Sequence, residues 1–285
     1  MSGGPPVMHA ACVQLRSGLD MAANIAAARE LVREAAGRGA KYVLTPENTA
    51  IMDEDKERVR ALCGTMEDDE AVRAFSALAA ELGIFLHAGS LAIRPEDAPP
   101  GDRRMANRSI LFGPDGRVIA WYDKIHLFDV QLGGEEKEHR ESAHIRPGSR
   151  AVMASAGDVP VGFSICYDLR FPALYRALAR AGALMLTIPA AFTVPTGKAH
   201  WHVLTRARAI ENAAFVLAAA QGGTHENGRR TFGHSLIISP WGEVLAEAAD
   251  EPCVIDAPLH MERATDMRRR IPVLENERDF SPPGV

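Results

Sequence analysis

The feature that most constrains the fold is a regular alternation of short β-rich runs with helical patterns along the whole chain. Such alternation is typical of an α/β protein, in which helices cover sheets that contain parallel strands. No low-complexity linker divides residues 1–285, so we expect one large domain with a C-terminal arm from about residue 271. Two α-β-β halves, packed sheet to sheet with helices outside, would use these elements economically. We therefore expect mixed β-sheets.

Charge and hydropathy exclude several classes of partner. The formal net charge is −5 and charged residues make up 24% of the chain, which leaves no basic footprint for nucleic acid and no polybasic membrane patch. No apolar run is long enough to span a bilayer, and residues 1–9 lack the cations of a secretory signal. We expect a cytoplasmic protein whose partner is a small molecule.

Three predicted strands end directly before a side chain with catalytic chemistry. Strand 42–45 precedes Glu47, strand 118–122 precedes Lys124, and strand 159–165 precedes Cys166. Strand ends are where α/β folds tend to place chemistry. Pro172 then starts a helix over residues 172–181, so Cys166 lies on a strand-to-helix elbow.

These three side chains fit the cleavage of an amide through a covalent intermediate. Cys166 is the candidate nucleophile, because the following helix N-terminus favours a thiolate; Glu47 is the candidate base, and Lys124 can hold the thiolate and the oxyanion. Each also has an ordinary interpretation, as a core thiol, a solvated acid or a surface cation. Spacing alone does not show that they converge, so it supports only a plausible thiol hydrolase.

The cysteines and histidines give no sign of a metal site. Cys12, Cys63, Cys166 and Cys253 lie far apart without a CxxC pair, so we expect reduced thiols. His200 and His202 would point to different faces of a helix over residues 199–213, with no acidic partner nearby in sequence. We therefore expect no metal.

Three segments resemble the signature blocks of the nitrilase superfamily, in that family's order. They read LTPEN at 44–48, YDKIHLFD at 122–129 and SICYDLRFP at 164–172. The resemblance implies a four-layer α-β-β-α sandwich and no cofactor. It also implies that Glu47 is the base, Lys124 the oxyanion-stabilising cation and Cys166 the nucleophile, with the backbone N–H of Tyr167 completing the oxyanion site.

A fourth block extends the match. Arg140-Glu-Ser142 before Arg146-Pro-Gly148 resembles the block that holds the family's second glutamate, so the resemblance implies that Glu141 orients Lys124 and substrate. The alternative is a solvated acid, because the same loop contains Glu135, Glu136 and Glu138. The whole loop, residues 129–150, is long and polar, which makes it a candidate rim or lid.

The downstream half is similar to the Nit branch of this superfamily. The segments that carry the similarity include PAAFT at 189–193, AAAQGG at 218–223 and PWG at 240–242, and the branch's usual acid is replaced by His202. The branch contains deaminated-glutathione amidases and ω-amidases, and AAQGG followed by THENGRR favours the former. The alternatives are an ω-amidase for 2-oxoglutaramate or 2-oxosuccinamate, nitrile or carbamoyl-amide hydrolysis or acyl transfer on the same scaffold, and a non-catalytic scaffold.

The resemblance also implies a homodimer or higher oligomer, paired through surfaces near the elbow and the C-terminal arm. Four further residues are candidates for the substrate pocket. Arg170 either binds a substrate carboxylate or pairs with Asp168. Tyr167, Phe192 and Thr193 are either pocket-wall or core residues.

Overall fold

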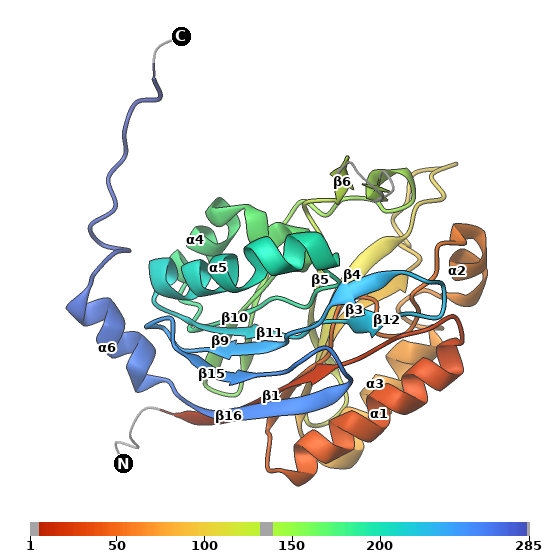
Figure 1. Ribbon diagram of the computed structural model, residues 1–285, viewed down its shortest axis with the longest axis horizontal. Helices are drawn as coiled ribbons and strands as arrows, with labels where there is room; N and C mark the ends of the chain where they lie inside the picture. Colours follow the sequence, from red (N-terminus) through yellow and green to blue (C-terminus); the bar gives the residue numbers. More distant parts are fainter. Residues whose placement is uncertain (1–5, 132–138, 284–285) are drawn as a thin grey trace.

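The computed structural model describes residues 6–131 and 139–283, which fold into two facing sheets covered by helices (Figure 1). Within those ranges each large sheet has six strands. The first sheet has the order β16 (Cys253–His260), β1 (Val7–Gln14), β2 (Tyr42–Leu44), β3 (Phe85–Ile93), β4 (Ala106–Phe112) and β5 (Val118–Asp123). The second has the order β15 (Val244–Glu247), β14 (Leu236–Ile238), β11 (Phe215–Ala218), β10 (Met185–Thr187), β9 (Val159–Phe163) and β8 (Met153–Ala156).

Both sheets are mixed, as predicted. Strands β1, β2 and β3 are parallel, and so are β9, β10 and β11, whereas the outer strands pair antiparallel. Helices α1 (Met21–Gly37) and α3 (Glu70–Leu82) pack on the first sheet, and α4 (Pro172–Arg180) and α5 (Val194–Asn212) on the second. The predicted four-layer α-β-β-α sandwich is confirmed, with helices on the two outer faces (Figure 1).

Strand β1 shows why the layers stack in this way. Successive side chains of a strand point to opposite faces, so Met8, Ala10 and Cys12 join the core between the sheets. Ala11 and Val13 join the second core, beneath α1 and α3. A strand that is covered on both faces reads as a continuous apolar run rather than an alternating one.

The strand directions bring the catalytic candidates to one edge. Because β3–β4 and β4–β5 are both antiparallel pairs, β5 runs in the same direction as β2 and β3. The chain therefore leaves β2 toward Glu47 and β5 toward Lys124 at the same edge of the first sheet. Gly89 on β3 lets the chain that follows β2 pass close to the β3 backbone, because a Cβ at residue 89 would lie 1.8 Å from the Thr45 carbonyl oxygen.

Several elements differ from the sequence prediction. Helix α5 begins at Val194 instead of residue 199, because Pro195 is tolerated in a first turn, where its missing N–H has no intrahelical partner. The sequence did not predict α2 (Lys56–Leu62), α6 (Glu262–Arg270) or the hairpin of β12 (Gly222–Thr224) and β13 (Arg230–Phe232). Beyond α6 the chain extends away from the body (Figure 1). In the described ranges, no helix is both long and apolar enough to cross a membrane.

Candidate active site

Glu47 lies in a tightly held turn after β2. Thr49 donates its hydroxyl hydrogen to the Pro46 carbonyl at 2.7 Å, and the Thr45 and Thr49 hydroxyls hydrogen-bond to each other at 2.7 Å. Asn48 has a left-handed backbone with φ of 56°, a conformation that Asn tolerates better than most residues. The turn leaves Glu47 buried, with 4% of its surface exposed.

Lys124 is buried between two glutamates. Its Nζ donates to Glu47 Oε1 at 2.8 Å and to Glu141 Oε2 at 2.9 Å, with only 1% of the residue exposed. A buried cation of this kind is stable only when it is paired and hydrogen-bonded. The two carboxylates outweigh desolvation and raise the pKa of Lys124 well above its usual value. The structure thus brings together two acids that are far apart in sequence.

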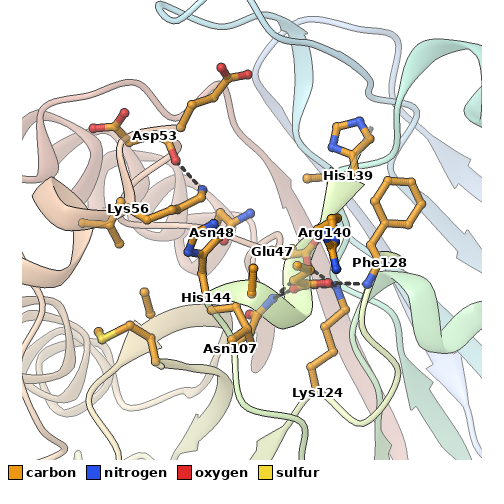
Figure 2. Close-up of a pocket in the computed structure, with 18 of the residues that line it drawn as sticks. Glu47, Asn48, Asp53, Lys56, Asn107, Lys124, Phe128, His139, Arg140 and His144 are labelled. Carbon is orange, nitrogen blue, oxygen red and sulfur yellow. Dashed lines mark hydrogen bonds and ion pairs between the residues drawn. The ribbon is translucent and has the colours of Figure 1, made fainter. Parts of the chain in front are cut away.

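Glu141 and Asn107 complete this cluster. Glu141 begins η1 (Glu141–Ala143), and its Oε2 also accepts the Phe128 N–H at 2.7 Å. Asn107, on β4, donates through Nδ2 to Glu47 Oε1 at 2.9 Å and to Glu141 Oε1 at 3.1 Å. Figure 2 shows Asn107 and Lys124 pointing toward Glu47. Sequence reasoning missed Asn107, although an amide in a buried apolar strand is a usable signal.

Cys166 begins the elbow that the sequence predicted, although the helix there is a 3₁₀ turn, η2 (Cys166–Arg170), before α4. Its φ of 48° is unusual for a residue with a side chain, and its N–H donates to the Pro189 carbonyl at 2.9 Å. A strained backbone persists only where its surroundings hold it. Here the turn places Cys166 in the lining of the same cavity as Glu47 and Lys124, and the charges of both affect the pKa of its thiol.

The surroundings of Cys166 favour the thiol over the thiolate. Burial raises the pKa of Cys166 well above its usual value, and the Glu47 charge raises it further, which outweighs Lys124 and the hydrogen bond from the Ala191 N–H. The pKa of Glu47 is lowered instead: burial would raise it, but Lys124, Cys166 and Asn107 outweigh that effect. The resting pair is therefore a neutral thiol and a carboxylate.

Asp168 joins the Lys124 segment to the elbow. Its Oδ2 accepts from the Tyr122 hydroxyl at 2.7 Å and from the Ile165 N–H at 2.8 Å. Its Oδ1 accepts from the His126 N–H at 3.0 Å and lies 2.7 Å from His126 Nδ1. Both oxygens of this fully buried carboxylate are thus engaged, which fixes residues 122–126 against the turn that carries Cys166.

Arg170 therefore does not pair with Asp168, which was one of its two predicted roles. Its guanidinium faces His200 Nδ1 at 3.3 Å and lies 5.5 Å from the Phe192 ring and 5.8 Å from the Tyr167 ring. Tyr167, Arg170, Phe192 and Thr193 all line one cavity together with Cys166. Phe192 and Thr193 are also buried, so these two residues both line the pocket and belong to the core.

The cavity has a volume of about 730 Å³ and opens above the Glu47, Lys124 and Cys166 cluster. Part of the predicted lid reaches it, because His139 to Glu141 and Ala143 to Ile145 lie in its wall. Residues 132–138 of that loop, including Glu135, Glu136 and Glu138, lie outside the described residues. Figure 2 shows Lys56, His139 and Arg140 around the same space. A volume of this size suits a small molecule.

Residues 9–269 match the profile of the carbon–nitrogen hydrolase family. The chain belongs to that family. It is 37% identical to a deaminated glutathione amidase of Synechocystis over 94% of this chain and 97% of that protein. It is 34% identical to the omega-amidase NIT2 of Danio rerio over 94% of each chain. These matches identify an enzyme that hydrolyses amides, in the Nit branch of the nitrilase superfamily, and exclude a non-catalytic scaffold.

Solved structures agree with this assignment. The C. elegans NitFhit protein superposes with a TM-score of 0.88 at 32% identity, over 97% of this chain and 66% of that chain. An amidase mutant from Nesterenkonia superposes with a TM-score of 0.78 at 26% identity, over 97% of each chain. That structure shows the acetamide moiety of fluoroacetamide added covalently at an active-site cysteine.

The lowered pKa of Glu47 gives a pH-dependent contribution to stability. A depressed carboxyl pKa stabilises the fold above the unfolded value, about 4.5, and this contribution is lost as pH falls through the folded pKa. We expect Glu47→Gln to lower the free energy of unfolding by on the order of 3 kcal/mol at neutral pH. The deficit relative to the unsubstituted protein should shrink below about pH 4.5 in urea titrations. Glu30→Gln, at an exposed position of α1, is the control, and a deficit that stays constant or grows in acid would contradict this assignment.

Proposed function

We propose that this enzyme hydrolyses a small linear amide that carries carboxylate groups, through a thioester on Cys166. The observation that carries the proposal is the buried Glu47–Lys124–Glu141 cluster next to the Cys166 thiol, in a cavity whose lining also carries cations. The substrate class that fits best is deaminated glutathione or a similar ω-amide of a 2-oxo acid. The names of the Synechocystis and Danio rerio relatives support that class.

In the first half-reaction, Glu47 takes the thiol proton as Cys166 Sγ attacks the amide carbon. The carbonyl oxygen becomes an oxyanion, which Lys124 Nζ and the Tyr167 N–H stabilise. Glu47 then gives its proton to the leaving nitrogen, the carbon–nitrogen bond breaks, and the amine departs from a thioester, as cysteinylglycine from deaminated glutathione or as ammonia from a primary ω-amide. In the second half-reaction, Glu47 takes a proton from water, the resulting hydroxide attacks the thioester, and the acid and the thiol are released.

The Lys124 hydrogen bonds explain how the charge moves. At rest its ammonium is held by Glu47 and Glu141. When Glu47 accepts the thiol proton it loses its negative charge, so its hold on Lys124 weakens just as the oxyanion forms. Glu141 keeps its charge and its position, supported by Asn107 and the Phe128 N–H. Lys124 can then redirect one N–H hydrogen bond from Glu47 to the oxyanion, while Glu141 remains its charge partner.

The cavity wall carries cations suited to carboxylates. Arg170 and Arg229 line it, and neither forms an ion pair with a carboxylate among the described residues. Arg229 Nη2 donates to the Ala191 carbonyl at 3.0 Å, and its buried Nε has no hydrogen-bond partner in the described ranges. Desolvation, with a further effect from the Arg229 charge, lowers the pKa of Lys56. A bound carboxylate would relieve this repulsion.

The size of the cavity favours the larger of the two substrates. A five-carbon ω-amide such as 2-oxoglutaramate would fill only part of a space of about 730 Å³. Deaminated glutathione carries two carboxylates separated by a peptide-like chain, which suits a wall that carries more than one cation, Lys56, Arg170 and Arg229 among them. The ω-amidase of Danio rerio supports 2-oxoglutaramate as the alternative.

Replacing the nucleophile should stop the reaction. We expect Cys166→Ala to lower kcat by roughly a thousandfold or more, because no other group can form the thioester. Cys253→Ala, at a half-buried position outside the cavity wall, is the matched control and should keep activity. Release of cysteinylglycine from deaminated glutathione, or of ammonia from 2-oxoglutaramate, measures the activity of both variants. Turnover by Cys166→Ala at the unsubstituted rate would exclude the mechanism.

Replacing a wall cation should affect charged substrates selectively. We expect Arg229→Met and Arg170→Met to raise KM for deaminated glutathione by roughly tenfold or more, since a charge-assisted hydrogen bond is worth about 1.5–3 kcal/mol. Hydrolysis of a neutral short-chain amide should change little. Arg180→Met, on the outer face of α4 where Arg180 pairs with Glu277, is the control. Equal losses on charged and neutral amides would contradict carboxylate recognition.

We further propose that the protein is a homodimer in the cytoplasm. Residues 271–283 extend from the body, with Phe280 88% exposed and Ile271 41% exposed (Figure 1). Large apolar side chains on an extended arm suit burial against a second copy. The described cysteines are free thiols, which fits the reducing conditions of the cytoplasm.

Sedimentation equilibrium tests the oligomer. We expect a dimer for the full chain and a shift toward monomer for a chain that ends after Arg270, because the truncation removes the arm and its apolar side chains. A full chain that sediments as a monomer at micromolar concentration would contradict the dimer. A truncated chain that remains fully dimeric would exclude the arm as its main contact.

A further inference from the structure

A second cluster of polar side chains lies outside the catalytic cavity wall. It consists of His202 on α5, His234 just before β14, and Glu247 at the end of β15. His202 Nε2 and His234 Nδ1 lie 2.9 Å and 3.0 Å from the same oxygen, Glu247 Oε1. The three candidate ligand atoms all lie within 4.8 Å of one another. Residues that are 45 positions apart in sequence thus converge on one point.

The backbone holds His234 in place. Its φ of 55° is left-handed, which a residue with a side chain adopts only when its surroundings fix it. Its N–H donates to the Ala249 carbonyl at 2.9 Å, and its carbonyl accepts from Trp201 Nε1 at 2.7 Å. Its ring stacks on Phe232, with the centroids 4.4 Å apart. The imidazole is therefore presented in a defined direction.

We propose that His202, His234 and Glu247 bind a divalent transition metal ion such as Zn²⁺. Two imidazoles and one carboxylate are an established ligand set for zinc, with a further position left to water. A tetrahedral ion with ligands at about 2.0–2.2 Å keeps its ligand atoms roughly 3.4 Å apart, so small side-chain rotations would open the cluster to an ion. The side chains are 31–38% exposed, so an ion can reach them from solvent.

The convergence distinguishes this cluster from two other histidine–carboxylate pairs among the described residues. His9 Nε2 lies 2.8 Å from Asp256, and His126 Nδ1 lies 2.7 Å from Asp168, each with a single imidazole. One imidazole and one carboxylate form an ordinary hydrogen bond and give only two ligands. The second imidazole at Glu247 provides the third ligand that a stable zinc site needs.

The proposed ion would lie directly behind the wall of the catalytic cavity. The Phe232 N–H donates to the Phe192 carbonyl at 3.0 Å, and Phe192 packs on Trp201 with ring centroids 4.9 Å apart. Phe192 lines the cavity. Through Trp201 and Phe232, which both contact His234, a bound ion would stiffen this wall. Binding should therefore raise the melting temperature, since an ion that binds only the folded state stabilises it.

Isothermal titration with Zn²⁺ tests the site. The protein is untagged, treated with a chelator and carries Cys166→Ala, so that the catalytic thiol cannot bind the ion. We expect about one equivalent of Zn²⁺ per chain and a higher melting temperature. His202→Gln, Glu247→Gln and His234→Asn should each weaken binding by roughly tenfold or more. Asn is chosen at 234 because it tolerates a left-handed backbone.

Two variants serve as matched controls. His9→Gln removes the imidazole of a single histidine–carboxylate pair, and His200→Gln removes a histidine on the same helix that faces Arg170 instead. Both variants should bind Zn²⁺ with the affinity of the parent protein. The proposal is overturned if the parent protein binds no Zn²⁺ saturably, or if binding survives all three cluster substitutions. It is also overturned if the controls lose as much affinity as the cluster variants.

Discussion

The buried ammonium of Lys124 is the interaction on which the site depends. Removing an unpaired ammonium from water costs several kcal/mol, so the fold must supply charge partners at hydrogen-bond distance. Glu47 and Glu141 do so from a strand end and from a loop, and Asn107 holds both carboxylates. The first sheet positions Glu47 and Lys124 because β2 and β5 run in the same direction and end at the same edge.

The same cluster sets the chemistry of the thiol. Glu47 is negatively charged and close to Cys166, so its charge, together with burial, keeps the proton on sulfur. Lys124 keeps Glu47 ionised and ready to accept that proton. Asp168 fixes the Lys124 segment against the elbow, and the left-handed backbone of Cys166 aims the sulfur. The proposed nucleophile, base and oxyanion cation are therefore held in place before substrate arrives.

Local patterns predicted much of the fold and of the site. Apolar runs that end at Pro46 or before Lys124 mark strand ends, and Pro172 marks a helix start, because these signals act within a few residues. The patterns missed the short helix α2, the polar helix α6 and the glycine-containing strand β12. Such elements have weak local signals, and tertiary packing and pairing stabilise them. Asn107 was missed because its two partners come from distant segments.

The sequence by itself determined the order of the elements, the edge residues Glu47, Lys124 and Cys166, and the family blocks around them. Only the tertiary structure decided that Cys166 rests as a thiol and that Arg170 faces His200 rather than Asp168. It also decided that His202, His234 and Glu247 meet. The reason is physical: helix starts and strand ends follow local chain geometry, whereas desolvation and the meeting of distant side chains depend on how the layers pack.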